Sequence, residues 1–211
     1  MNIQDAYTNW AATYDEDRNR TRDLDQQVTH ATLAGDHCVH VVEIGCGTGK
    51  NTAFLTQIAD RVTALDFSAG MLARAREKVR AANVTFGEAD LTQRWPVEDE
   101  SADLVVCNLV LEHIEDLRFI FAEAARVLAD NGRFLVCELH PFRQYGGTVA
   151  TFQRGEGAVL IDAYVHHISD FVIAAKESSL TLHSLREWWH VEDGGKPPRL
   201  VSFVFEKAGG A

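Results

Sequence analysis

The chain has 211 residues, of which 46% are apolar and 24% are charged. That length buries a sizeable core but is too short for two full-sized domains, so we expect residues 1–211 to form one domain. With 20 basic and 31 acidic residues, the net charge of −11 argues against a general nucleic-acid-binding protein. No apolar run reaches the roughly 18 to 20 residues that span a bilayer, and the N-terminus lacks the layout of a secretion signal. We therefore expect a cytoplasmic protein with neither a nucleic-acid nor a membrane partner.

Short apolar runs alternate with segments of helical periodicity. The apolar runs, which predict strands, are residues 39–44, 61–65, 84–86, 102–107 and 133–139. Helices are predicted for residues 50–59, for the segment that follows the N-cap Ser68, and for an apolar stripe that starts at Leu117 and ends at Asn131-Gly132. Continuous apolar strands are buried on both faces, and strand–helix alternation builds parallel sheets. The pattern therefore predicts a doubly wound α/β domain.

The C-terminal third has a different pattern. Two β segments flank residues 154–157, and residues 180–189 and 199–207 predict a final pair of strands. We expect this region to close the sheet and to cover the site, which in such folds lies beyond the carboxyl ends of the strands.

Four cysteines, Cys38, Cys46, Cys107 and Cys137, are widely spaced and include no C-x-x-C pair. This spacing argues against a zinc ribbon or a redox dithiol. Two disulfides are compatible with the even number, but a core of this size does not need them. Three of the four lie in or beside apolar runs, so we expect free, buried thiols.

A glycine-rich loop, EIGCGTGKNT at residues 43–52, joins the first strand to the next helix. Its glycines allow a tight turn and the close approach of a ligand to the backbone. A P-loop would need glycine where Ile44 stands and Ser or Thr where Asn51 stands, and the third glycine comes one position too early for a dinucleotide loop. Glu43 would repel a pyrophosphate and suits a cationic ligand.

Acidic residues also follow the later strands. Asp66 stands 21 residues after Gly45, which is about the spacing at which a carboxylate receives ribose hydroxyls, and Asp90 follows the third strand. The pattern predicts a nucleoside ligand without phosphate. S-adenosylmethionine, which combines adenosine with an ammonium and a sulfonium group, meets these requirements.

The segments VVEIGCGTGKNT, LDFSAGML, GEADL, DLVVCNLVLEHIED and RVLADNGRFLVCELHPFR, within residues 39–143, resemble the successive motifs of class I S-adenosylmethionine-dependent methyltransferases. The chain is most similar to the small-molecule branch, which includes ubiquinone-biosynthesis and malonyl-carrier-protein methyltransferases. The resemblance implies a Rossmann-like, mostly parallel seven-stranded sheet with an antiparallel C-terminal strand and a small lid insertion. It also implies that residues 1–30 cover the cofactor, 31–140 form the cofactor-binding core, 141–168 form a substrate lid and 169–211 complete the sheet.

The same resemblance assigns the cofactor-binding residues. The assigned parts are the methionine part (Glu43, Gly45, Cys46, Gly47), the ribose (Asp66), the adenine surroundings (Phe67, Met71), the adenine edge (Asp90, Leu91), the neighbourhood of the methyl group (Asn108, Leu109) and the aromatic N-terminal cover (Tyr14). Phe67, Met71 and Leu91 are equally compatible with packing in the core.

A sulfonium methyl group is already activated, so the reaction needs a base only when the acceptor carries a proton. The candidate bases are His113, His140 and His167, and in a strand only one of the adjacent His166 and His167 would face the site. A helix-surface or capping role is the alternative for His113. No ligand spacing for a catalytic metal is present, because Glu112-His113 reverses the order of H-E-x-x-H.

The sequence therefore predicts a methyltransferase that acts on oxygen, nitrogen or carbon of a small molecule and releases S-adenosylhomocysteine. A catalytically silent S-adenosylmethionine-binding accessory protein would share the same glycine loop. An NAD-dependent oxidoreductase is opposed by the glycine spacing and by Glu43. The acceptor and the oligomeric state are left open.

Overall fold

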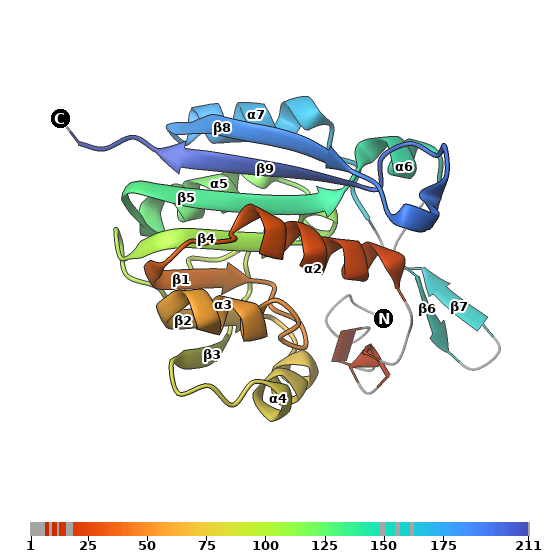
Figure 1. Cartoon of the computed structure of the whole chain (residues 1–211), viewed down its shortest axis with the longest axis horizontal. Coiled ribbons are helices and arrows are strands. Elements are labelled where there is room, and N and C mark those ends of the chain that lie inside the picture. Colours follow the sequence, from red (N-terminus) through yellow and green to blue (C-terminus); the bar gives the residue numbers. More distant parts are fainter. Residues whose placement is uncertain are drawn as a thin grey trace.

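The computed structural model describes residues 7–8, 10–11, 13–15, 19–147, 151–154, 157–160 and 163–210. Within these residues a seven-stranded sheet has the strand order β3-β2-β1-β4-β5-β9-β8 (Figure 1). The parallel strands are β1 (Cys38–Ile44), β2 (Ala59–Asp66), β3 (Val84–Glu88), β4 (Ala102–Asn108) and β5 (Leu128–Leu139). β9 (Leu200–Lys207) runs antiparallel to both β5 and β8 (Leu180–Trp188). The predicted fold class and the closure of the sheet by the last two strands are confirmed.

Helices cover both faces of this sheet. One face packs against α3 (Thr52–Ile58) and α4 (Ala69–Lys78), which bury Leu55 and Leu72. The other face packs against α5 (Leu117–Val127) and α7 (Ile168–Glu177), around a stacked core that includes Phe121 and Phe203. α2 (Arg20–Thr32) lies across the first face over β5 and β9. Burial on both faces explains why the strands read as continuous apolar runs.

The carboxyl ends of the parallel strands meet at one edge of the sheet, on the right of Figure 1. The short helix α6 (Pro141–Tyr145), the hairpin of β6 (Thr151–Arg154) and β7 (Gly157–Leu160), and the N-terminal helical residues gather there. Two one-turn helices, η1 (Leu111–His113) and η2 (Val191–Asp193), complete this edge. The β segments expected around residues 154–157 are confirmed as the β6–β7 pair.

Two local predictions are wrong. Helix α5 ends at Val127 instead of at Asn131-Gly132, because β5 begins at Leu128. Ala102 pairs with Leu128 and Leu104 pairs with Arg133, so the turn at Asn131, with φ +62°, lies inside an irregularity of β5. The expected strand at residues 166–167 is also absent, because His167 is the N-cap of α7.

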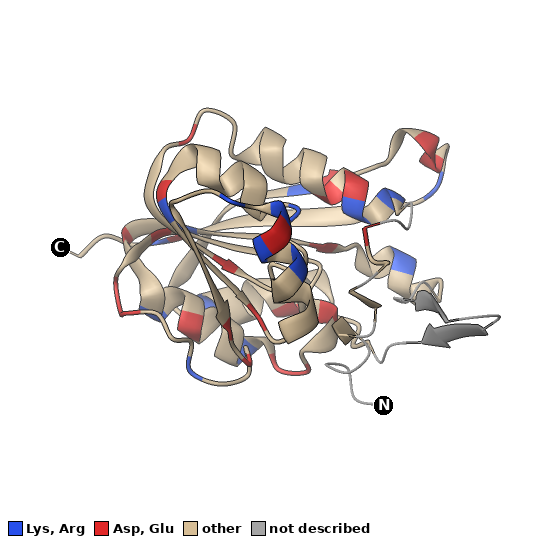
Figure 2. Cartoon of the chain, turned by 90° about the horizontal axis from the view of Figure 1, so that it is seen from below, with Lys and Arg blue, Asp and Glu red and all other residues tan. Residues whose placement is uncertain are grey.

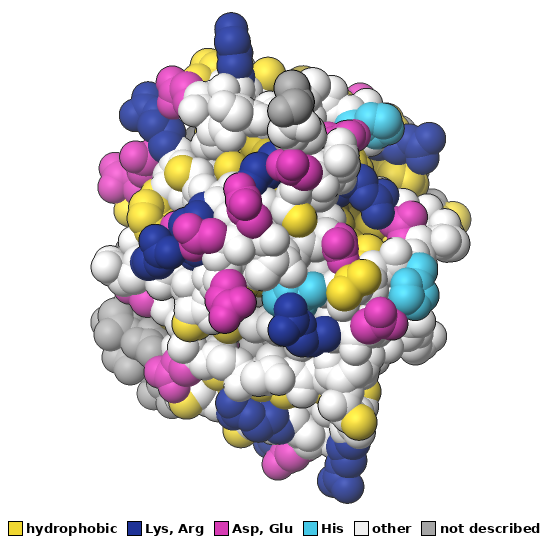
Figure 3. All heavy atoms as spheres, turned by 90° about the vertical axis from the view of Figure 1, so that its left-hand side faces the viewer, with side chains coloured by type: hydrophobic (Ala, Val, Ile, Leu, Met, Phe, Trp, Pro, Cys, Tyr) yellow, Lys and Arg dark blue, Asp and Glu magenta, His cyan; other side chains and the backbone are white. Residues whose placement is uncertain are grey.

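Acidic and basic residues are interspersed over helices and loops (Figure 2), and the edge of the sheet opposite the strand carboxyl ends carries both signs of charge (Figure 3). Among the described residues we find no helix with the length and apolar character to cross a bilayer. In the same part of the chain, no three His, Cys, Asp or Glu side chains gather as metal ligands do. All four cysteines are free and buried.

Candidate active site

The glycine loop begins where β1 ends and leads into α3. Gly45, Gly47 and Gly49 all have positive φ, at 70°, 52° and 78°. A Cβ on Gly45 would lie 2.1 Å from Val110 Cγ2, so glycine is required there for packing against the segment after β4. A Cβ on Gly47 would meet no heavy atom within 4 Å. Gly47 therefore leaves open space beside the loop.

A cavity of about 70 Å³ lies between the glycine loop, α2 and the end of β4. Seven of the predicted cofactor-binding residues line it: Tyr14, Glu43, Gly45, Cys46, Gly47, Asn108 and Leu109. The parallel sheet explains this grouping, because β1 and β4 are hydrogen-bonded neighbours and their carboxyl ends lie side by side. Leu109, with φ +56°, turns the chain away from β4 at this point.

Asp25 of α2 also lines the cavity, and it was not among the residues predicted from the sequence. Asp25 accepts hydrogen bonds from Asn51 Nδ2 at 2.9 Å and from Asn108 Nδ2 at 2.5 Å. Both amide nitrogens point to this carboxylate, and the two amide oxygens are consequently buried without a hydrogen-bond partner. Burial raises the pKa of Asp25. The cavity thus offers two free acceptors beside a carboxyl group, which suits a ligand that donates hydrogen bonds.

Glu43 lies in the same cavity at the end of β1. Its Oε2 accepts a hydrogen bond from Thr52 Oγ1 at 2.5 Å. Burial, together with the neighbouring Asp25 and Asp66, raises the pKa of Glu43 to about 8. Glu43 is therefore largely protonated at pH 7 unless a cation lies beside it. The prediction from the sequence was a negatively charged side chain.

Asp66 ties the glycine loop to α4. Its Oδ2 accepts from Gly47 N and its Oδ1 from Ser68 N, both at 2.8 Å, and the residue is buried. Ser68 in turn caps α4 by accepting from Met71 N, and its hydroxyl lies 3.0 Å from Thr8 Oγ1. A carboxylate has about four lone-pair sites, so Asp66 keeps acceptor capacity after these two bonds.

Asp66 and four other predicted residues do not line the cavity. Phe67 lies edge-on to Tyr7 with ring centroids 5.9 Å apart, and Met71 is buried in α4. Asp90 is exposed and accepts hydrogen bonds from its near neighbour Thr92. Leu91 is buried in the core beside α5. These four residues follow β2 and β3, the strands that lie beside β1 in the sheet, and they are outside the cavity at the glycine loop.

The three candidate histidines have different surroundings. His113 Nε2 lies 2.8 Å from Tyr7 Oη. His140 caps α6, because its Nδ1 accepts from Phe142 N while its Nε2 lies 2.9 Å from Glu187 Oε1. Burial lowers the pKa of His140. His167 is exposed and lies 2.6 Å from the hydroxyl of Tyr145.

The N-terminal aromatic residues form a cluster that includes one predicted residue. Trp10 lies edge-on to Tyr14 with ring centroids 4.6 Å apart, and Tyr7 touches both rings. The guanidinium of Arg22 lies 4.0 Å from the Tyr14 ring centroid, and its Nη1 donates to Tyr14 O. The helical spacing of Tyr7, Trp10 and Tyr14 was the signal that could have marked this cluster.

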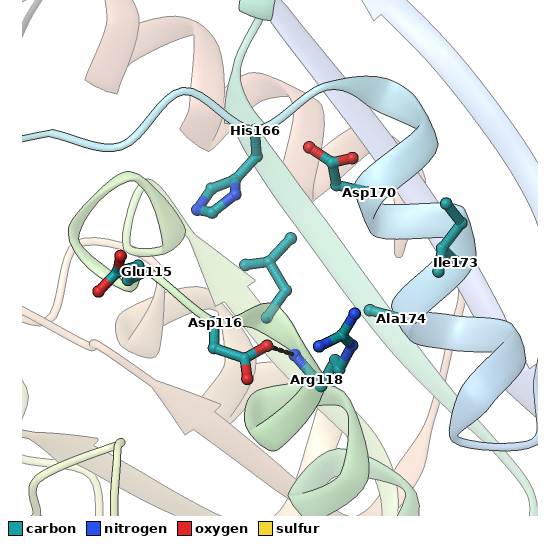
Figure 4. A pocket seen from close by; sticks show the side chains of 8 residues that line it. Glu115, Asp116, Arg118, His166, Asp170, Ile173 and Ala174 are labelled. Atoms are coloured by element: carbon teal, nitrogen blue, oxygen red, sulfur yellow. Dashed lines mark hydrogen bonds between the residues drawn. The ribbon is translucent and has the colours of Figure 1, made fainter.

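A larger cavity of about 340 Å³ lies elsewhere, between the start of α5 and α7 (Figure 4). Asp116, His166 and Asp170 are among its lining residues. It contains none of the predicted cofactor-binding residues and no part of the glycine loop. Size alone does not make it the active site, because the converging polar groups lie in the smaller cavity.

Comparisons with known proteins agree with this geometry. Residues 42–136 match the methyltransferase domain family. The predicted resemblance to class I S-adenosylmethionine-dependent methyltransferases is thereby confirmed, and S-adenosylmethionine is the cofactor of that family.

The chain aligns with part of the length of two relatives whose names state an activity. Demethylmenaquinone methyltransferase from Tropheryma whipplei (strain Twist) is 28% identical over 172 residues, which cover 80% of this chain and 65% of that protein. Malonyl-[acyl-carrier protein] O-methyltransferase from Hahella chejuensis is 31% identical over 138 residues, covering 64% of this chain and 48% of that protein. The chain thus spans about half to two thirds of the length of these relatives.

Solved structures share the fold. The DhpI–SAH complex aligns with a TM-score of 0.75 at 22% identity and covers 97% of this chain and 95% of its own. An S-adenosylmethionine-dependent methyltransferase from Mesorhizobium loti aligns with a TM-score of 0.72 at 20% identity, covering 86% and 96%.

Proposed function

We propose that the chain transfers a methyl group from S-adenosylmethionine to oxygen, nitrogen or carbon of a small-molecule acceptor by in-line displacement. The observation that carries the proposal is the pair of unpartnered amide oxygens of Asn51 and Asn108, in a cavity that also holds the buried carboxyl groups of Asp25 and Glu43. Buried acceptors without partners are unfavourable unless a ligand donates to them. The α-ammonium group of the cofactor is such a donor.

The remaining features of the cavity fit the amino-acid part of this cofactor. The open space at Gly47 allows a ligand to approach the loop. Arg22 and Lys50 line the same cavity and bring positive charge for the cofactor's carboxylate. A nearby ammonium and sulfonium would also favour the ionised form of Glu43, which otherwise holds a proton.

The adenosine part is assigned to the adjoining strand ends. Asp66 would bind the ribose hydroxyls with the acceptor capacity left by its two backbone bonds. Phe67 and Met71 would surround the adenine, and Asp90 with Leu91 would meet its edge. Support for this assignment comes from the strand order, because β2 and β3 follow β1 along the same edge.

S-adenosylmethionine, when bound, supplies a methyl group that needs little further activation, so the protein's task is to orient the acceptor and exclude water. We propose that residues 1–30 cover the cofactor and that residues 141–168 cover the acceptor. The first cover is supported by the bond from Thr48 Oγ1 to Asp15 Oδ1, at 2.8 Å. The second is supported by the bond from Tyr164 N to Glu112 O, at 2.7 Å.

Among the three histidines, we retain His113 as the proton acceptor. His140 caps α6 and lies beside Glu187 of β8, and His167 is the N-cap of α7, so their contacts favour structural roles. A silent S-adenosylmethionine-binding protein would bind the cofactor without turnover, whereas an NAD-dependent enzyme would bind the dinucleotide instead.

The test combines binding with transfer. S-adenosylhomocysteine should raise the melting temperature and NADH should not, and labelled methyl groups should pass from S-adenosylmethionine to a component of a pooled metabolite extract. Asp66→Ala should abolish the S-adenosylhomocysteine shift, while Glu88→Ala, at the exposed position paired with Asp66 on β3, should keep it. Binding without transfer to any extract would favour the accessory protein, and a shift with NADH alone would overturn the proposal.

A further inference from the structure

Tyr7 occupies a central position above the strand carboxyl ends. Its ring lies 5.9 Å from that of Phe67, after β2, and 5.5 Å from that of His113, after β4. It also contacts Tyr14, which lines the cofactor cavity. The phenol therefore lies between the elements that frame the proposed adenosine site and the turn that follows Asn108.

The hydroxyl of Tyr7 forms a hydrogen bond with the imidazole of His113. Tyr7 Oη lies 2.8 Å from His113 Nε2, and the two residues are 106 positions apart in the chain. The side chain of His113 is only 10% exposed. A phenol and an imidazole in this arrangement can pass a proton in either direction.

Glu112 lies beneath this pair. Its Oε1 lies 3.9 Å from His113 Nε2, and its Oε2 is buried without a hydrogen-bond partner. The charged and titratable groups that face it are His113 on the same turn, Tyr7 from the N-terminal segment and Glu138 from β5. Burial raises the pKa of Glu112 to about 7. A buried carboxyl oxygen without a hydrogen-bond partner is unfavourable for folding, so its position beside an imidazole indicates a function for Glu112.

The turn itself is rigidly held. Glu138 Oε1 accepts from Val110 N at 2.9 Å and from Leu111 N at 3.0 Å. His166 Nε2 lies 3.0 Å from Leu111 O and 2.7 Å from Ile114 O on the opposite side. These hydrogen bonds hold the backbone of the turn that carries Glu112 and His113, and none of them involves Glu112 Oε2.

We propose that Tyr7, His113 and Glu112 form a proton-accepting chain, with Tyr7 as the catalytic residue that touches the acceptor and Glu112 as a positioning residue. This inference rests on the proposed function and narrows its substrate class. The acceptor is a nucleophile that loses a proton on methylation, such as a hydroxyl, an N–H group or a C–H group, rather than a thioether or a tertiary amine.

An electron pair of the acceptor forms the bond to the methyl carbon (a lone pair on oxygen or nitrogen, or at carbon the pair freed as the proton leaves), while the carbon–sulfur bond breaks and leaves its electrons on sulfur. The acceptor's proton passes to Tyr7 Oη as the proton of Tyr7 passes to His113 Nε2. The imidazolium that results lies beside the Glu112 carboxylate, which stabilises its charge.

An NMR titration tests the chain without any acceptor. A carboxyl group close to an imidazole favours the imidazolium to the extent that it is ionised, so Glu112→Gln should lower the pKa of His113. The matched control Glu115→Gln, at an exposed position three residues on, should leave it unchanged. An unchanged pKa in Glu112→Gln would overturn the role of Glu112.

The transfer assay tests Tyr7. With the acceptor found in the pooled extract, Tyr7→Phe should lower kcat by about 100-fold or more and leave the Kd for S-adenosylhomocysteine within threefold of the original value. The acid limb of the pH profile should move to lower pH in Glu112→Gln, because the pKa of His113 falls, whereas in Glu115→Gln it should stay in place. Unchanged turnover in Tyr7→Phe would overturn the chain. If the original protein itself transfers nothing, the proposed function fails, and the NMR titration still decides whether the three groups are coupled.

Discussion

Gly45 and Gly47 give the sharpest test of which part of the glycine loop serves the fold and which serves the ligand. Both have positive φ, so an alanine at either position costs about 1 to 2 kcal/mol in the left-handed region. At Gly45 the new Cβ would also lie 2.1 Å from Val110 Cγ2, and such overpacking adds about 1 to 3 kcal/mol. Gly45→Ala should therefore lose about 2 to 5 kcal/mol of stability and Gly47→Ala only about 1 to 2 kcal/mol.

Thermal melts with and without S-adenosylhomocysteine separate the two roles. For a chain of this size, about 1 kcal/mol corresponds to roughly 2 to 4 °C, so Gly47→Ala should melt about 2 to 8 °C below the original protein. A ligand at 100 times its Kd contributes about 2.7 kcal/mol, or roughly 5 to 11 °C. Gly47→Ala should lose that ligand shift because its methyl group occupies the open space, whereas Gly45→Ala should keep it. A full ligand shift in Gly47→Ala would refute the placement of the cofactor against this loop.

Two further predictions concern buried carboxyl groups and are read from urea denaturation across pH. Burial raises the pKa of Glu43 from 4.5 to about 8, so between these pH values the folded state binds a proton that the unfolded state does not, and the free energy of unfolding falls as pH rises. Because glutamine does not titrate, the free energy of unfolding of Glu43→Gln should gain a few kcal/mol relative to that of the original protein between pH 5 and pH 8.5. Parallel stability curves for the two proteins would contradict this. The guanidinium of Arg199, with that of Arg143, holds the pKa of Asp193 well below its usual range, so the stability that the Asp193 carboxylate contributes is complete above about pH 4 and is lost as pH falls. Asp193→Ala should therefore lower the free energy of unfolding by about 3 to 5 kcal/mol at pH 7 and by much less at pH 2. An unchanged free energy of unfolding at pH 7 would contradict this.

The sequence predicted those features that follow from local periodicity and from the geometry of parallel sheets. Strands buried on both faces had to read as apolar runs, and Glu43 and Asn108 had to meet because β1 and β4 end at the same edge. The turn at Asn131-Gly132 was assigned to the end of a helix because glycine commonly follows a helix, yet the same residues also fit an irregularity in a strand.

Contacts between distant segments were beyond the reach of the sequence. The bonds of Asp25 to Asn51 and Asn108 span 26 and 83 residues, and that between Tyr7 and His113 spans 106. No spacing rule connects such positions, because tertiary packing alone sets their distance. The ionisation of Glu43 was misjudged for a related reason, since its raised pKa arises from burial.

A crystal structure with S-adenosylhomocysteine would show whether the cofactor binds at the glycine loop. The ligand's ammonium group should donate to Asn51 Oδ1 and Asn108 Oδ1, and its ribose hydroxyls should contact Asp66. A product molecule bound away from the glycine loop, or a loop cavity left empty at saturating ligand, would contradict it.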